Sequence, residues 1–145
     1  MLVHEALRLV LLADADVIAI TTRIYPSILP QDCEFPALVY DRQGKETIER
    51  MDSRGHAGLA AFIIRFWSIS NLDEGGADTV YALDEAVRLC LQGYSGSVAD
   101  PDSSPEESVF INGIFYRETR QGYDDKTRTY QCITDYEVWA GETQP

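Results

Sequence analysis

The segment 59-LAAFIIRFWSI-69 carries the strongest strand signal in the sequence and decides how the flanking segments are interpreted. Successive side chains of a strand point to opposite faces, so Phe62, Ile64 and Phe66 share one face and the odd-numbered residues share the other. Arg65 is the only charged residue in the segment. So little charge on either face is typical of the interior of a sheet. We therefore predict a central strand with both faces largely covered.

Helical patterns occupy the N-terminal region. Apolar residues recur at helical spacing in Leu2–Ala13, which predicts an amphipathic first helix. Asp14 or Asp16 can cap a short second helical turn through Val17–Ile20, because a carboxylate accepts the free amides of a helix start. Each proline removes an amide donor and disfavours helix before it, so Ile24–Pro36 is predicted to be an extended, ordered connector.

The segment Ala37–Arg42 (ALVYDR) predicts a strand that pairs with Leu59–Ile69. A weaker polar alternation continues it toward Met51. The residues of Asp52–His56 have turn chemistry and indicate the link between the two strands.

A second long helix and a loop are predicted after the central strand. Asn71 or Asp73 can cap a helix that ends near Gln92, where Gly93 supplies a C-terminal stop. The stretch Gly93–Ser108 is rich in Gly, Ser, Pro and acid, and this composition predicts a long polar loop.

Two further strands, Val109–Thr119 and Thr129–Trp139, close the chain, with a turn around Gly122–Asp125 between them. The order of elements predicts an α+β fold, in which a mainly antiparallel sheet of about four strands carries two main helices packed on one face. A length of 145 residues suits a single domain over residues 1–145.

Composition restricts the class of partner. The chain has 24 acids against 12 Lys and Arg residues, a formal net charge of -12. An acidic surface does not attract phosphate backbones or anionic bilayers, so we expect no specific nucleic-acid binding and no membrane association. The cysteines Cys33, Cys90 and Cys132 form no CxxC pair and are expected to be free, buried thiols of a soluble protein in a reducing cytoplasm.

Catalytic motifs are incomplete. His4-Glu5 begins like a zinc-protease helix, but Arg8 stands where the second histidine ligand belongs. His56, the other histidine, falls in the predicted turn, where a solvated side chain is expected. We predict no enzyme activity, no catalytic residue, no metal and no cofactor. The alternative is a small metal-dependent hydrolase that uses Asp100, Asp102 and Glu107, although the spacing of an EF-hand is absent.

Several aromatic residues stand apart from the predicted core. Trp67 and Trp139 lie on predicted strands, which favours core packing. Tyr94 and Tyr123 are aromatic where solvent is otherwise expected, which makes them candidates for an interface.

The order of short motifs along the chain resembles the tail-completion (tail-terminator) proteins of long-tailed bacteriophages and prophages. The motifs are Leu11-Leu12-Ala13-Asp14, Arg23-Ile24-Tyr25-Pro26, Leu29-Pro30-Gln31, Pro36-Ala37-Leu38-Val39-Tyr40, Arg65-Phe66-Trp67 and Asp135-Tyr136-Glu137-Val138-Trp139. Their order, spacing and the total length carry the resemblance over nearly the whole chain. The acidic loop around Asp100–Glu107 and the pair Gly75-Gly76 are atypical of that family.

The resemblance implies a homo-oligomeric ring, commonly of six subunits, on the head-proximal end of the tail tube. Such a ring stops tube polymerisation and provides the head-tail joining surface. Its expected partners are itself, the major tail tube protein and a head-tail connector protein, while DNA passes through the channel without specific binding. The expected location is the virion tail, with assembly in the host bacterial cytoplasm. The alternative within the same particle is another neck or connector protein.

The expected contact elements are the Gln43–Ala57 hairpin region and the acidic loop. The interface residues that we predict are Arg54, His56, Tyr94, Asp100, Asp102, Glu106, Glu107 and Tyr123.

Overall fold

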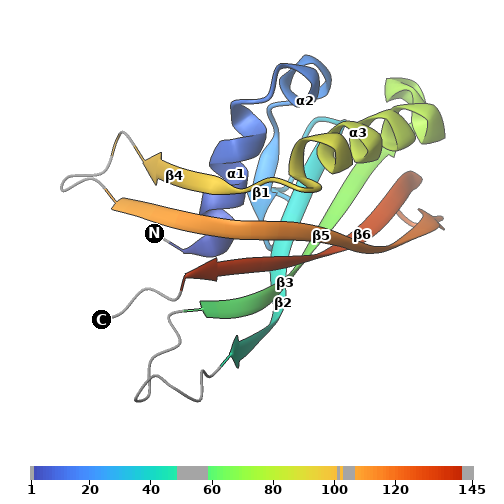
Figure 1. The fold of residues 1–145 in the computed structure, drawn as a ribbon. Helices are drawn as coiled ribbons and strands as arrows, with labels where there is room; N and C mark the ends of the chain where they lie inside the picture. Colours follow the sequence, from blue (N-terminus) through green and yellow to red (C-terminus); the bar gives the residue numbers. More distant parts are fainter. Residues whose placement is uncertain (1, 49–58, 101, 103–106, 142–145) are drawn as a thin grey trace.

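The structure, a computed structural model, describes residues 2–48, 59–100, 102 and 107–141. This part of the chain forms three α-helices and a six-stranded sheet with the strand order β1-β2-β3-β6-β5-β4. Figure 1 shows a strongly curled sheet with the helices gathered on one face. The predicted α+β class is confirmed, whereas the prediction of about four strands is wrong.

The elements are α1 (Val3–Leu12), α2 (Ala15–Ile20), β1 (Ile24–Pro26), β2 (Ala37–Ile48), β3 (Leu59–Asn71), a 3-10 turn (Leu72–Glu74), α3 (Gly76–Leu91), β4 (Gly96–Asp100), β5 (Glu107–Asp124) and β6 (Thr129–Gly141). Neighbouring strands are antiparallel except β1 and β2, which are parallel. No helix in the described ranges combines the length and the apolar character needed to cross a membrane.

The N-terminal helices form as predicted, and the structure decides between the two candidate caps. Asp14 Oδ1 accepts hydrogen bonds from the backbone N–H of Asp16 at 2.9 Å and of Val17 at 3.1 Å. These bonds satisfy two amides that a helix start leaves open. Leu7 and Leu11 of α1 are fully buried, so the apolar stripe of α1 faces the sheet.

The predicted connector Ile24–Pro36 contains a strand. β1 pairs with the beginning of β2, and Leu38 N–H donates to the carbonyl of Arg23 at 2.8 Å. β1 lies at the edge of the sheet, where Pro26 can be accommodated although it has no N–H. The prolines of this segment disfavour a helix but do not predict a strand. β1 forms because it pairs with β2, which is distant in sequence.

β3 lies in the interior of the sheet, between β2 and β6, as predicted. Phe62, Ile64 and Phe66 are buried in the core beneath the helices. The opposite face differs from the prediction, because Arg65 and Trp67 remain partly exposed. The helices cover one face of the sheet only (Figure 1), and we call the other face the open face.

The segment Gly93–Ser108 is not one long loop. Gly96–Asp100 forms β4, which pairs with the beginning of β5, and Val98 is 7% exposed within the core. Val98 is the single buried side chain of a five-residue strand. The sequence of β4 therefore has no alternation of apolar residues that would predict a strand. β4 forms because it pairs with the backbone at the beginning of β5.

The closing hairpin is longer than predicted. β5 begins at Glu107 and continues into the expected turn as far as Asp124, so that the reversal falls at residues 125–128. Register shifts occur between Ile111 and Gly113 and between Tyr116 and Glu118. Each such bulge adds a residue to one strand and reverses the phase of its alternation, which obscures a strand of this length in the sequence.

The third helix begins later than predicted. Asn71 Oδ1 accepts a hydrogen bond from Glu74 N–H at 3.0 Å, but this bond caps the 3-10 turn instead of α3. Gly75 separates the two with a φ of 95°, a conformation that glycine adopts without strain. Leu83 and Leu91 lie fully buried on the predicted apolar stripe of α3.

Candidate functional site

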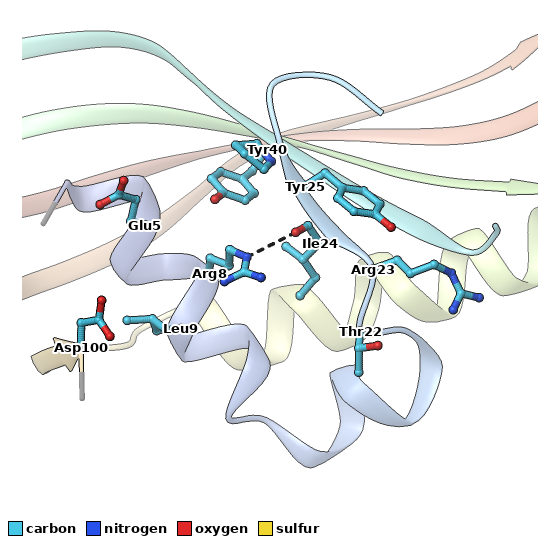
Figure 2. A pocket seen from close by; sticks show the side chains of 10 residues that line it. Glu5, Arg8, Leu9, Thr22, Arg23, Ile24, Tyr25, Tyr40 and Asp100 are labelled. Atoms are coloured by element: carbon cyan, nitrogen blue, oxygen red, sulfur yellow. Dashed lines mark hydrogen bonds between the residues drawn. The ribbon is translucent and has the colours of Figure 1, made fainter. Parts of the chain in front are cut away.

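A cleft of about 510 Å³ separates α1 from β1 and the adjoining part of β2 (Figure 2). Its lining residues are Glu5, Arg8, Leu9, Thr22, Arg23, Ile24, Tyr25, Pro26, Tyr40 and Asp100. Asp100 is contributed by β4, so the cleft lies where the curled sheet brings β4 near β1 across α1.

The two arginine side chains of the cleft donate hydrogen bonds to backbone carbonyl groups. Arg8 Nε donates to the carbonyl of Ile24 at 3.3 Å and joins α1 to β1 (Figure 2). Arg23 donates from Nε to Glu34 O at 3.0 Å and from Nη2 to Phe35 O at 3.1 Å. Both side chains therefore hold local structure around the cleft, independently of any ligand.

Burial changes the acid-base properties of Tyr40, which lines the cleft, and of its neighbour His4. It raises the pKa of Tyr40 and lowers the pKa of His4, whose ring lies 6.1 Å from that of Tyr40. Both shifts favour the neutral side chain at pH 7. Glu5 and Asp100 add negative charge to the lining, while Arg8 adds positive charge. A cleft lined by acidic, basic and apolar side chains is more typical of a contact with another protein than of a catalytic centre.

The predicted interface residues are not brought together. Asp102 N–H donates to Asp100 Oδ1 at 3.0 Å, so these two acids share a local turn after β4. Tyr94 is half-buried and packs against the core. Tyr123 is 50% exposed, and its ring packs against that of Tyr130 at an interplanar angle of 50°, with ring centroids 4.8 Å apart. Because Asp100 pairs with the first residue of β5 and Tyr123 lies near its last, the two are at opposite ends of that strand.

The remaining predicted residues are not visible as side chains. Arg54, His56 and Glu106 lie outside the described residues, as does most of the Gln43–Ala57 region. Glu107 begins β5, and its side chain also falls outside the description. Within the part of the chain that is described, no group of three His, Cys, Asp or Glu side chains is arranged to hold a metal ion.

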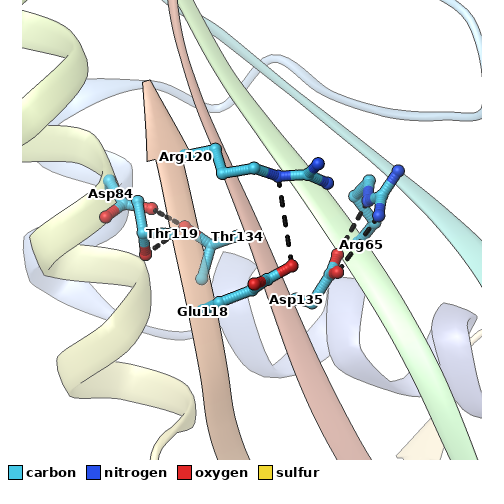
Figure 3. Close-up of polar contacts among 7 residues, drawn as sticks. All are labelled: Arg65, Asp84, Glu118, Thr119, Arg120, Thr134 and Asp135. Atoms are coloured by element: carbon cyan, nitrogen blue, oxygen red, sulfur yellow. Dashed lines mark hydrogen bonds and ion pairs between the residues drawn. The ribbon is translucent and has the colours of Figure 1, made fainter. Parts of the chain in front are cut away.

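A chain of hydroxyl groups links α3 to the sheet (Figure 3). Thr134 Oγ1 donates to Asp84 Oδ1 at 2.6 Å and is bonded to Thr119 Oγ1 at 2.9 Å. Tyr116 OH donates to Thr119 Oγ1 at 2.9 Å. Each hydroxyl has one proton, so Thr119 must donate to Thr134 once Thr134 donates to the carboxylate. All donors in this chain therefore point toward Asp84. Desolvation by burial nevertheless raises the pKa of Asp84.

The open face carries an ion pair across two strands. Arg65 of β3 donates to Asp135 of β6 from Nε at 2.7 Å and from Nη2 at 3.1 Å (Figure 3). The hydrogen bonds that Arg65 donates to Asp135, together with the opposite charge of that carboxylate, raise the pKa of Arg65. On β5, Arg120 and Glu118 form a looser, exposed pair at 4.0 Å.

Aromatic residues surround these charges on the open face. Phe110 is 56% exposed and Phe115 is 55% exposed. Trp67 and Trp139, which the sequence places in the core, are instead half-buried on this face. Trp139 Nε1 is inaccessible to solvent and has no hydrogen-bond partner among the described residues.

One bulge places both phenylalanines on the open face. Phe110 and Phe115 are an odd number of positions apart, so a regular strand would put them on opposite faces. The register shift between Ile111 and Gly113 removes that difference. Gly113 also leaves room for the neighbouring ring, since a Cβ there would stand 3.3 Å from Phe115. The sequence analysis did not predict this surface. The only signal in the sequence was the presence of aromatic residues on the last two predicted strands, and which of them are exposed cannot be read from the sequence.

Comparisons with known proteins support the fold. No family model matches the chain, and no curated protein matches it in sequence. A chain in the solved structure described as "Virion of native gene transfer agent (GTA) particle" is similar in structure, with a TM-score of 0.68 over 97% of this chain and 95% of that chain. The two sequences are 16% identical.

Proposed function

We propose that this protein is a structural component of a phage-like particle and that it acts as a tail-completion protein. The observation that carries the proposal is the structural likeness to a chain of a gene transfer agent virion over 97% of this chain. The order of sequence motifs, which resembles tail-completion proteins, supports the same role. The protein would form a ring on the head-proximal end of the tail tube, stop tube growth and offer the head a joining surface.

Such a role requires selective surfaces and no catalytic centre. A terminator must bind the last ring of the tube on one side and reject further tube protein on the other. The described surfaces suit protein contacts, because they combine exposed aromatic side chains with charges of both signs. Tyr123, Asp100 and Asp102 remain proposed contact residues, as do Arg54, His56, Tyr94, Glu106 and Glu107.

The net charge of -12 per subunit suits a ring through which DNA passes. Negative side chains near the channel repel phosphates and keep DNA from adhering during transit. The proposed partners are further copies of this chain, the major tail tube protein and a head-tail connector protein. The proposed location is the head-proximal end of the virion tail, after assembly in the host cytoplasm.

The test uses tail tubes assembled without this protein. Purified protein is added to the tubes, and gold-labelled copies are located by electron microscopy. We expect label at one end of each tube and no elongation of labelled tubes when tube protein is supplied. Label at a different position, with unchanged elongation, would support another neck or connector protein. The absence of any binding to tubes or to other particle components would overturn the proposal.

The hydrolase alternative has a separate test. A metal that binds the native state must raise its melting temperature. If calcium, magnesium and manganese each leave the melting temperature unchanged, a site made from Asp100, Asp102 and Glu107 is excluded.

A further inference from the structure

The two outermost strands of the sheet are short, and each lies beside part of a much longer neighbour. β1 pairs with residues 38–40 of β2, and β4 pairs with residues 107–111 of β5. Both long strands extend beyond these short partners. We call residues 43–48 of β2 the β2 arm and residues 117–124 of β5 the β5 arm.

The β5 arm presents backbone hydrogen-bonding groups on its outer side. Gly93 N–H donates to the carbonyl of Ile114 at 2.9 Å, so the backbone groups of Ile114 point away from β6. These groups alternate sides along a strand, and the register shift between Tyr116 and Glu118 moves the alternation by one residue. The N–H and C=O of Gln121 therefore point outward, where no described strand pairs with them.

The same alternation orients the β2 arm. The carbonyl of Tyr40 accepts a hydrogen bond from Ser27 N–H at 2.8 Å, so the backbone groups of Tyr40 point away from β3. The register shift between Arg42 and Gly44 moves the alternation by one residue. The N–H and C=O of Thr47 therefore point outward, and β1, which ends at Pro26, does not reach them.

The outer side of β1, in contrast, is closed by bonds within the chain. Ile24 N–H donates to the carbonyl of Thr22 at 3.1 Å, and the carbonyl of Ile24 accepts from Arg8 Nε at 3.3 Å. Pro26 has no N–H, and its carbonyl accepts from Ile28 N–H at 2.7 Å. A strand edge whose backbone groups are occupied in this way does not pair with a further strand.

The strand directions determine how the two arms can meet. β2, β3, β6 and β5 are successive neighbours, and each pair of them is antiparallel. β2 and β5 therefore run in opposite directions. When copies are related by rotation about one axis, β5 of one copy is antiparallel to β2 of the next. Antiparallel pairing would thus continue from one copy to the next without reversing either sheet.

The arms lie at opposite ends of the sheet (Figure 1). Through the strand registers, Gln121 is level with Leu38, whereas Thr47 is level with Ile111. Pairing of the two arms therefore displaces neighbouring copies along the strand direction. Sheets that close on themselves have tilted strands with a stagger of this kind.

We propose that the β5 arm of one copy pairs as an antiparallel strand with the β2 arm of the next copy. Backbone hydrogen bonds supply the contact, so it does not require complementary side-chain charges. This inference rests on the ring in the proposed function and names the strands that join its subunits. Each copy contributes one arm of each kind, and such a head-to-tail contact can close into a ring.

The test removes one outward N–H from each arm. Proline is tolerated at an edge position whose N–H points away from the sheet, so Gln121→Pro and Thr47→Pro should fold. Each is expected to weaken self-association about tenfold or more in sedimentation velocity. The matched controls, Gln121→Ala and Thr47→Ala, keep the N–H and should associate as the wild type does. Circular dichroism and melting temperatures show which variants are folded.

Mixing the two proline variants tests the head-to-tail geometry. Gln121→Pro keeps an intact β2 arm, and Thr47→Pro keeps an intact β5 arm. An equimolar mixture is therefore expected to form a species of two copies and nothing larger, although neither variant associates alone. A mixture of folded variants that forms no such species would overturn the inference.

Hydrogen exchange of the wild type provides a measurement that needs no substitution. The outward amide of Gln121 is expected to exchange at least tenfold more slowly in the assembly than in the dilute monomer. The amide of Arg120 points toward Ile133 of β6 and should be protected in both states. Equal exchange at Gln121 in the two states would overturn the inference even if a proline variant failed to fold.

The outcomes separate this inference from the proposed function. If the wild type assembles and both folded proline variants assemble equally well, the inference is overturned and the ring remains. If Gln121→Pro alone weakens assembly, the β5 arm pairs with another β5 arm or with a different protein, which also overturns the inference. A wild type that stays monomeric in solution and on tail tubes overturns the ring and this inference together.

Discussion

Thr134 donates a 2.6 Å hydrogen bond to Asp84 and thereby connects β6 to the middle of α3. The bond ends a relay of hydroxyl groups that begins at Tyr116 and passes through Thr119. Most of the surface between α3 and the sheet is apolar, so these hydrogen bonds form a small polar network within a hydrophobic interface. A satisfied polar network of this kind specifies one register of helix against sheet.

The first prediction concerns the donor of that bond. Thr134→Val keeps the shape of the side chain but removes the hydroxyl, which leaves the Asp84 carboxylate without this donor and the Thr119 hydroxyl without its acceptor. We expect the free energy of unfolding to fall by about 1–3 kcal/mol, because an unsatisfied buried polar group bears its full desolvation cost. Urea denaturation measures the change. Thr22→Val, at an exposed position, is the control and should have little effect. Equal stability of the two variants would show that the relay contributes nothing.

The second prediction concerns the pH dependence of the acceptor. Burial raises the pKa of Asp84, so the native state holds this proton more tightly than the unfolded chain does. Stability due to this group is therefore present at low pH and is lost as the pH rises through the folded-state pKa. Asp84→Asn keeps an acceptor for Thr134 and removes the titration.

We expect Asp84→Asn to be more stable than the wild type at neutral pH. The difference should shrink as the pH falls toward the native pKa of Asp84. Melting temperatures measured from pH 7 downward test this expectation. A gap that widens on acidification would contradict the assigned direction of the shift.

The third prediction concerns the ion pair on the open face. Asp135 is 9% exposed, so Arg65→Met leaves its charge poorly solvated. We expect this variant to lose about 2 kcal/mol of stability, and Arg65→Met/Asp135→Asn to lose less than the sum of the single changes. The Glu85–Arg88 pair, exposed on one helix, provides the comparison. Its coupling energy should be much smaller, because solvent screens an exposed pair. Coupling of the same size in both cycles would count against a special role for the shielded pair.

The fourth prediction concerns the thiols. Burial raises the pKa of Cys90 to about 12 and the pKa of Cys132 to about 11. At pH 8 the reactive thiolate is then only about 10⁻⁴ of Cys90 and about 10⁻³ of Cys132. We expect iodoacetamide to label Cys33 first in the native protein, with all three labelled alike in urea. Peptide mass spectrometry over time gives the order. Early modification of Cys90 would contradict the prediction.

The thiols also show where burial was misjudged from sequence. All three were expected to be buried, yet only Cys132 is, while Cys33 and Cys90 are partly exposed. A cysteine carries no periodic signal of its own. Its burial follows from the elements that pack around it, such as the loop after β1 for Cys33.

The sequence by itself determined those helices and strands that depend on residues close together in the chain. The first helix, a second helix capped by Asp14 or Asp16, the strand around Ile64 and the stripe of α3 follow from spacing, capping chemistry and alternation within short segments. These features depend on neighbours within one or two turns, and nearby side chains are enough to define them.

The tertiary structure decided what depends on distant partners. β1 and β4 are short edge strands that form because β2 and β5 present unpaired backbone to them. The open face with Phe110 and Phe115 arises from a bulge that reverses the alternation of β5. Trp139 lies on that face by its register with Ala61, and it is only half-buried because the helices pack on the other face. Pairing, register and the coverage of each face are set by contacts between segments far apart in the chain, which local patterns do not contain.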